Sequence, residues 1–183
     1  MYYRIEVNPI NIGTVVETPF SLNPTRVNVV QNKVGWQFLS QLVDKSLSTG
    51  YSLFKICNEA VEKNPNIWTL LPGIWEVLFE RSRPSNIPVR RTDCTFFFKK
   101  KEDALNFHKT YPGMQTGQLC KVDIIKEVFS KEVDMNWLES IDENTATAME
   151  IIKAFGNYWS GMMTSNPIVE VLFVGKYKLN PIK

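Results

Sequence analysis

The first residues of the chain alternate in character with the two-residue period of a β-strand. Arg4 and Glu6 fall on the face opposite Ile5. Asn8-Pro9 follows, and proline removes a backbone donor that a strand needs. The pattern therefore predicts one strand over residues 2–7.

A helical period replaces this alternation further along the chain. Residues 8–33 come first, are rich in Asn, Pro and Thr, and predict a long irregular segment with a short strand at 26–30. Segments of this length inside a compact domain are often functional. From 35 to about 82, apolar residues recur at helical spacing and are interrupted by Pro65 and Pro72-Gly73. Three helices are expected, with the apolar stripes Trp36, Leu39, Val43 and Leu47, then Phe54, Cys57 and Val61, then Ile74, Trp75, Leu78 and Phe79.

The second half of the chain mixes strand and helix patterns. The strand patterns lie at 94–98, 119–125, 168–174 and 177–179, the last two joined at Gly175-Lys176. Helices are expected around Ala104, shortly after Asp134, and over 145–155, whereas residues 156–167 look irregular. This order favours a single α+β domain over residues 1–183, with a mixed or antiparallel sheet and the helical segment of about 35–82 within it.

Composition narrows the class of protein. Apolar residues make up 44% of the 183, which is enough for a sizeable core and argues against global disorder. The net charge is only +2, so charge gives no general argument for nucleic-acid binding. Neither a signal peptide nor an apolar run near the ~18 residues of a membrane helix is found. We expect a soluble, cytoplasmic protein or one delivered into a target cell's cytosol.

The metal-binding residue types are few. Cys57, Cys94 and Cys120 are far apart and form no CxxC pair, which is typical of buried thiols in a reducing compartment. His108 is the single histidine, which excludes any mechanism that needs two histidines and makes a zinc site improbable. We therefore expect no metal.

Standard motifs for phosphate binding, metalloproteolysis or a hydrolase nucleophile are absent from the sequence. Arginines remain as candidates, because a guanidinium fits phosphate or ribose hydroxyls through forked hydrogen bonds. Arg4 in the first strand is either such a clamp or a solvated residue. Arg90 and Arg91 lead into the strand at 94–98 and are either phosphate contacts or a solvated loop pair. Thr95 in that strand is either an ordinary strand residue or a hydroxyl that positions a neighbouring polar group.

Three further features carry open alternatives. Tyr158 and Trp159 suit either a pocket wall that stacks on a flat ring or the filling of the core. The segment "DMNW" at 134–137 contains a Trp that also fits a loop anchor. Glu170 is the one carboxylate of an apolar strand, and it is either on a wet face or required there, since a buried unpaired charge is costly.

Five segments together resemble the ADP-ribosyltransferase superfamily, and more narrowly a poorly characterised bacterial branch of domains of unknown function. They are "YYRI" at 2–5, "FFFKKKEDA" at 96–104, "DMNW" at 134–137, "YWSG" at 158–161 and "EVLFVGKYKL" at 170–179. The branch shows an early "lYR" strand, "F-x-F-x-x-x-x-x-A", "D-x-N-W", "YW-x-G" and a closing "E-x-L-x-x-G-x-Y-x-V" hairpin. The resemblance spans nearly the whole chain and is weakest over 8–90.

The resemblance implies a fold and a cofactor. The fold is a split β-sandwich of two small mixed or antiparallel sheets with NAD+, the substrate, in the cleft, and here with an inserted helical block. Arg4 matches the first-strand residue that holds the cofactor, Thr95 the middle-strand hydroxyl, and Glu170 the late-strand catalytic carboxylate. Arg90 and Arg91 are further expected to contact the pyrophosphate or adenosine ribose. The nicotinamide ring is expected to stack on Tyr158 or a strand aromatic, with Tyr158 or Trp159 on the wall of the cleft.

The implied activity is transfer of ADP-ribose from NAD+ to a macromolecular acceptor, protein or nucleic acid. Many protein-modifying members carry Glu or Gln two residues before the catalytic Glu, where this chain has Ile168, which makes the usual arginine acceptor doubtful. A toxin, effector or phage-defence setting, with a neutralising antitoxin or chaperone, follows from the resemblance alone. Two alternatives stay open: a degenerate member that binds a nucleotide or protein without transfer, and an unrelated α+β interaction domain.

Overall fold

The computed structural model describes residues 1–18 and 32–182, so the strand expected at 26–30 lies outside the described residues. The chain divides into two compact units. Unit 1 consists of residues 1–20, 93–135 and 163–183, and unit 2 of residues 21–92 and 136–162. Each unit therefore draws on separate stretches of the sequence.

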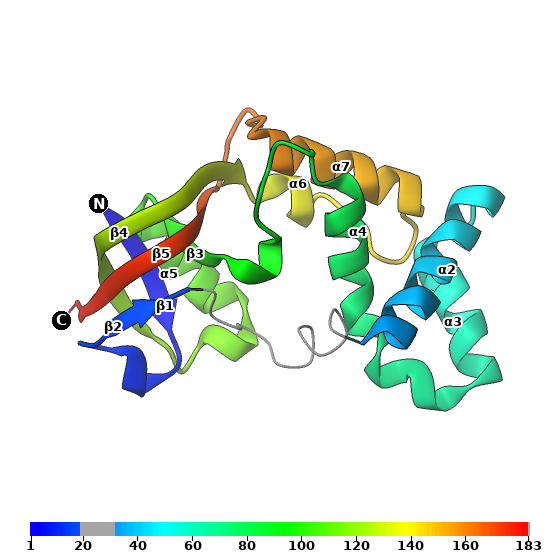
Figure 1. Ribbon diagram of the computed structural model, residues 1–183, viewed down its shortest axis with the longest axis horizontal. Coiled ribbons are helices and arrows are strands. Elements are labelled where there is room, and N and C mark those ends of the chain that lie inside the picture. The colour runs from blue at the N-terminus through cyan, green and yellow to red at the C-terminus, as the bar shows by residue number, and fades with distance from the viewer. Residues whose placement is uncertain (19–31, 183) are drawn as a thin grey trace. The chain divides into compact units, whose positions relative to one another are not determined.

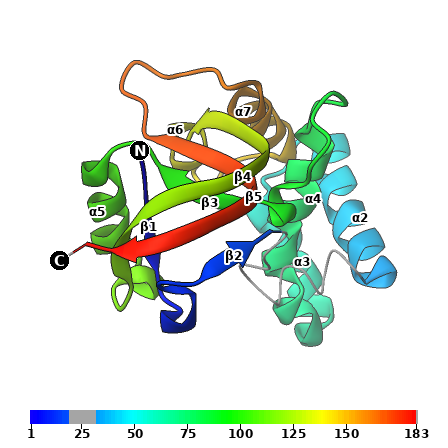
Figure 2. The ribbon, with the colours of Figure 1, turned by 60° about the vertical axis from the view of Figure 1, so that its left-hand side comes forward.

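Unit 1 holds the sheet. In the described part of the chain five strands pair in the order β2–β5–β3–β1–β4, every pairing is antiparallel, and β4 also pairs with β5. Four strands therefore close on themselves, and β2 extends the sheet from β5. Figure 1 shows β4 and β5 as two long neighbouring ribbons, and Figure 2 shows the same pair from another side. The strands are β1 (Tyr2–Glu6), β2 (Val15–Glu17), β3 (Thr95–Phe98), β4 (Gln118–Asp134) and β5 (Val169–Pro181).

The register of the strands separates two faces of the sheet. Residues directly opposite each other on antiparallel strands point to the same face, and neighbours along a strand point to opposite faces. The inner face carries a cluster of buried residues around Phe97, Phe173 and Tyr177. The outer face carries a second cluster around Ile5 and Phe98, which helix α5 (Lys101–Thr110) covers with Ala104 and Phe107.

Unit 2 is helical. The helices in the described part of this unit are α2 (Lys33–Thr49), α3 (Leu53–Lys63), α4 (Ile74–Ser82), α6 (Asn136–Glu139) and α7 (Ala148–Ser160) (Figure 1). Short 3₁₀ turns occupy Pro9–Asn11, Pro65–Thr69, Leu71–Gly73, Arg91–Asp93 and Pro112–Met114 of the chain. The Phe79 and Phe155 rings stack with centroids 3.9 Å apart, which joins α4 to α7 in the core of this unit.

The structure confirms the α+β class and the antiparallel sheet, and it locates the expected helical segment in α2, α3 and α4. The described strands, however, join in one sheet that closes on itself rather than in two separate small sheets. None of the described helices is long and apolar enough to cross a membrane.

The last two strands were predicted wrongly as separate elements. β5 runs without interruption from Val169 to Pro181 because Gly175 is an extended strand residue and not part of a turn. β4 continues nine residues beyond the expected end at Ile125, since pairing with β5 supplies backbone partners to a segment whose side chains are largely exposed. The short strand β2 was missed for the same reason, because pairing with β5 and not its own pattern forms it.

The prediction that residues 156–167 are irregular is also wrong for the first of these residues. α7 continues to Ser160, and Gly161 ends it with φ of 80°, the left-handed conformation that glycine adopts without steric cost. The glycine of "YWSG" is thus explained by the end of a helix. Thr147 and Glu150 begin the same helix with a capping box.

Candidate functional site

Arg4 lies on the inner face of the closed sheet and is held from several sides. Its Nη1 donates to the hydroxyl of Thr95 at 2.9 Å and to the carbonyl of Phe96 at 3.1 Å. Its Nε donates to Glu6 Oε2 at 3.0 Å. The Arg4 side chain is 11% exposed and that of Glu6 is 3% exposed, so this ion pair is largely removed from water.

Glu6 connects this pair to the segment after β1. Its Oε1 accepts hydrogen bonds from the backbone N–H of Asn8 at 3.0 Å and from the Nδ2 of Asn11 at 3.3 Å. Both carboxylate oxygens therefore have donors, which is the condition for a buried charge to be tolerated. The alternation of residues 2–7 places Arg4 and Glu6 on one face, and this two-residue spacing was the available signal for their pairing.

Tyr177 completes the polar cluster from β5. Its hydroxyl lies 3.4 Å from the hydroxyl of Thr95. Burial raises the pKa of Tyr177 above its ordinary value, although the positive charge of Arg4 acts in the opposite direction. Burial, and then the negative charge of Glu6, likewise raise the pKa of the Cys120 thiol. Nothing local in the sequence indicated that Tyr177 belongs here, because β5 supplies it through long-range pairing.

Glu170 lies on the same set of strands but on the other face. It stands opposite Phe98 of β3, which in turn stands opposite Tyr3 of β1. Arg4 is one position away from Tyr3 and Thr95 is three positions away from Phe98, and these odd separations put both on the inner face. Glu170 is 4% exposed. The cleft expected to be shared by Arg4 and Glu170 is therefore not formed on one face of the sheet.

Asp134 of the "DMNW" segment holds the residues before β5 against the end of β4. Asp134 Oδ2 accepts from the backbone N–H and the hydroxyl of Thr164 at 2.8 and 2.6 Å, and its Oδ1 accepts from the N–H of Ile168 at 3.0 Å. Asp134 is fully buried. In unit 2, Trp137 Nε1 donates to the carbonyl of Met162 at 2.6 Å, which is the loop-anchor alternative for this tryptophan.

The remaining candidates belong to unit 2. Tyr158 and Trp159 are fully buried in α7, and Trp159 Nε1 donates to the carbonyl of Phe79 at 3.0 Å. The guanidinium of Arg91 lies 4.5 Å from the centre of the Phe79 ring, and its Nε is within 3.5 Å of the Tyr158 hydroxyl. These contacts fit the core-filling alternative for both aromatics. A contact of any of these side chains with NAD+ stays a prediction.

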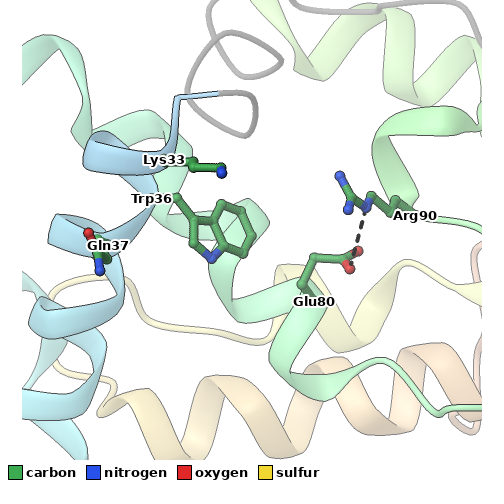
Figure 3. A pocket seen from close by; sticks show the side chains of 5 residues that line it. All are labelled: Lys33, Trp36, Gln37, Glu80 and Arg90. Atoms are coloured by element: carbon green, nitrogen blue, oxygen red, sulfur yellow. Dashed lines mark ion pairs between the residues drawn. The ribbon is translucent and has the colours of Figure 1, made fainter.

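Arg90 differs from Arg91 because it is exposed at the surface of unit 2. Its Nε lies 3.9 Å from Glu80 Oε2, and its side chain is 55% exposed. An ion pair of this length and exposure contributes little to stability. Arg90 is one of the residues that line the pocket drawn in Figure 3.

The described residues contain no cluster of three or more His, Cys, Asp and Glu side chains suited to a metal ion. A search of curated proteins found no match to the chain. A family model described as "Protein of unknown function (DUF2441)" matches residues 8–182. Since this match covers nearly the whole chain, the protein belongs to that family of proteins of unknown function.

Proposed function

We propose that the protein is an NAD+-dependent ADP-ribosyltransferase that modifies a macromolecular acceptor, protein or nucleic acid. The observation that carries the proposal is the strand order, because Arg4, Thr95 and Glu170 come from the adjacent strands β1, β3 and β5. These are the three positions that the resemblance assigns to the site. In this proposal the closed sheet of unit 1 takes the place of the split β-sandwich.

Glu170 lies on one face of the sheet and Arg4 and Thr95 on the other, so the proposal gives them different roles. Glu170 is the carboxylate that meets the reacting ribose. Arg4 and Thr95 are positioning residues, since their mutual hydrogen bond fixes β1 against β3 from the inner face. In this proposal Arg4 does not contact the cofactor directly, although the resemblance implies such a contact.

The chemistry needs one well-placed carboxylate. The bond between C1′ of the ribose and the nicotinamide nitrogen breaks, the nitrogen keeps the electron pair, and positive charge develops on the ribose. A fixed carboxylate in a site that excludes water stabilises such a charge strongly. The acceptor's nucleophile then forms a bond to C1′ and loses its proton.

A second candidate is a nucleotide-binding or protein-interaction domain without transfer. The observation that favours it is the register, which separates Glu170 from Arg4 and Thr95 across the sheet. In this second candidate the Arg4–Glu6 pair has only a structural role, which is to fix the segment after β1.

Measuring binding and bond cleavage separately distinguishes the two candidates. Purified protein is mixed with NAD+ and a bacterial lysate as the source of acceptors, and free nicotinamide is quantified by chromatography, while NAD+ binding is measured by calorimetry. The transferase predicts both binding and nicotinamide release above a lysate control. Binding of NAD+ without release would favour the second candidate and reject the transferase.

A further inference from the structure

A pocket in unit 2 brings a tryptophan and two cations together from separate elements. Lys33, Trp36 and Gln37 come from the start of α2, Glu80 from α4 and Arg90 from the connection after α4. The cavity volume is about 440 Å³. This lies within the ~300–1,000 Å³ range of small-molecule sites. Figure 3 shows Lys33 above the Trp36 ring and Glu80 with Arg90 to its right.

The charges of the pocket favour an anion. Glu80 Oε2 accepts from both Nη2 and Nε of Arg83, at 2.9 and 3.2 Å, so a nearer arginine already holds this carboxylate. The contact with Arg90 is longer, at 3.9 Å. Lys33 is exposed and makes no ion pair with any residue in the described ranges. Among the described residues that line the pocket, two cations, Lys33 and Arg90, therefore outnumber the one carboxylate.

The aromatic ring adds a requirement for a flat group. Trp36 is partly buried, and its ring offers a hydrophobic surface inside the pocket (Figure 3). Bases of single-stranded nucleic acid stack on such rings, while lysine and arginine contact the adjacent phosphate. Gln37 supplies an amide that both donates and accepts hydrogen bonds, which suits the edge of a base.

We propose that the Trp36 pocket binds a nucleotide, with its base on the Trp36 ring and its phosphate between Lys33 and Arg90. The nucleotide is either free or one unit of a single strand, because both carry the same chemistry. The inference goes beyond the proposed transferase activity and does not depend on it, since Glu170 belongs to unit 1 and the pocket to unit 2.

Fluorescence anisotropy of the full-length protein with a labelled single-stranded 12-mer tests the proposal, with NAD+ left out. Competition by adenosine and cytidine monophosphates forms a second arm. Displacement of the 12-mer by monophosphates supports a free-nucleotide site, and binding of the 12-mer alone supports a strand site. Failure of both ligands to bind overturns the proposal, as does competition by inorganic phosphate as effective as that by monophosphates.

Variants assign the binding to this pocket. Trp36→Leu is expected to weaken binding about tenfold, since stacking on one aromatic ring contributes roughly 1–3 kcal/mol per base. Trp36→Phe keeps an aromatic face and is expected to retain most of the affinity. Trp68→Leu is the matched control, because Trp68 is a 66% exposed tryptophan of the same unit that does not line the pocket.

Lys33→Gln tests the electrostatic part. It is expected to weaken binding at low salt and to reduce the slope of log affinity against log salt by about one, as for a single phosphate contact. Circular dichroism and the melting temperature verify that each variant is folded. Equal losses in Trp36→Leu and Trp68→Leu, or an unchanged salt slope in Lys33→Gln, contradict the assignment. Glu170→Gln is expected to bind the 12-mer like the wild type. A failure of the transferase proposal can therefore be distinguished from a failure of the nucleotide-binding proposal.

Discussion

Thr95 connects Arg4 and Tyr177 in the polar cluster of unit 1. Its side chain is fully buried, accepts a hydrogen bond from Arg4 and lies beside the hydroxyl of Tyr177. The sequence left two alternatives for Thr95, an ordinary strand residue or a hydroxyl that positions a polar neighbour, and in the structure the hydroxyl accepts from Arg4. A buried arginine that loses such an acceptor leaves an N–H without a partner, which is more costly than the bond itself is stabilising.

We predict that Thr95→Val, which keeps the shape but removes the hydroxyl, lowers the free energy of unfolding by about 1–3 kcal/mol. Urea denaturation followed by circular dichroism measures this change. Thr110→Val is the control, since Thr110 is exposed at the end of α5. A denaturation midpoint equal to that of the wild type would show that the Arg4 contact contributes nothing.

Cys57 gives a pH dependence with a definite sign. Burial raises the pKa of this thiol from 9.0 to about 11. The unfolded chain therefore loses this proton at lower pH than the folded chain does. The corresponding stability is fully present below pH 9 and is lost as the pH rises from 9 through 11.

We predict that between pH 8 and 11 the wild type loses up to roughly 2–3 kcal/mol more unfolding free energy than Cys57→Ala. Urea denaturation at each pH measures the two curves. The pKa values of Tyr177 and Cys120 are also raised, but both variants share those contributions, so they cancel in the difference. Parallel curves for the two proteins refute the prediction.

At the scale of elements, β5 organises unit 1 because it pairs with β2, β3 and β4. Its register with β4 shifts on both sides of Gly175, between Ile124 and Lys126 and between Glu127 and Phe129 of the partner strand. Gly175 has φ of 154°, and its N–H donates to the hydroxyl of Thr18 at 2.6 Å. A Cβ atom placed on this glycine lies 2.0 Å from the carbonyl oxygen of Lys126.

We predict that Gly175→Ala destabilises the protein by roughly 3 kcal/mol or more, because both the backbone angle and the approach of β4 exclude a side chain. Thermal and urea denaturation measure the loss. Gly113→Ala provides the comparison, since nothing lies within 4 Å of a Cβ at that glycine. Similar stability of the two variants would mean that β4 moves away from β5 at little cost.

Local patterns determined which elements could be predicted. The alternation in β1 and the helical stripes of α2, α3 and α4 are properties of their own residues, so the sequence revealed them. β2, the second half of β4 and the continuity of β5 depend on partners far along the chain. Gly175 resembled a turn residue because the sequence alone does not distinguish a turn glycine from one that a neighbouring strand requires.

For the whole molecule, the sequence predicted the strands that carry Arg4, Thr95 and Glu170 but not the faces on which these residues lie. Arg4, Thr95 and Glu170 do come from three neighbouring strands. Their side-chain faces depend on register, and a shift of one residue reverses the face, so a motif in sequence order does not determine which residues meet. Arg90, Arg91, Tyr158 and Trp159 belong to unit 2, which the pattern over residues 1–183 did not separate from the sheet.

The direct test of the central claim is transfer of label from NAD+ to macromolecules by the wild type and by Glu170→Gln. Purified protein is incubated with NAD+ labelled in its adenylate phosphate and a bacterial lysate, and label in the precipitated protein and nucleic acid is counted. Glu132→Gln is the control, because Glu132 is an exposed carboxylate of β4 whose ion pair with Lys99 lies at the surface. We predict wild-type transfer for Glu132→Gln and a loss of about a hundredfold or more for Glu170→Gln. Equal transfer by Glu170→Gln and the wild type, or no transfer by any of the three, would contradict the account.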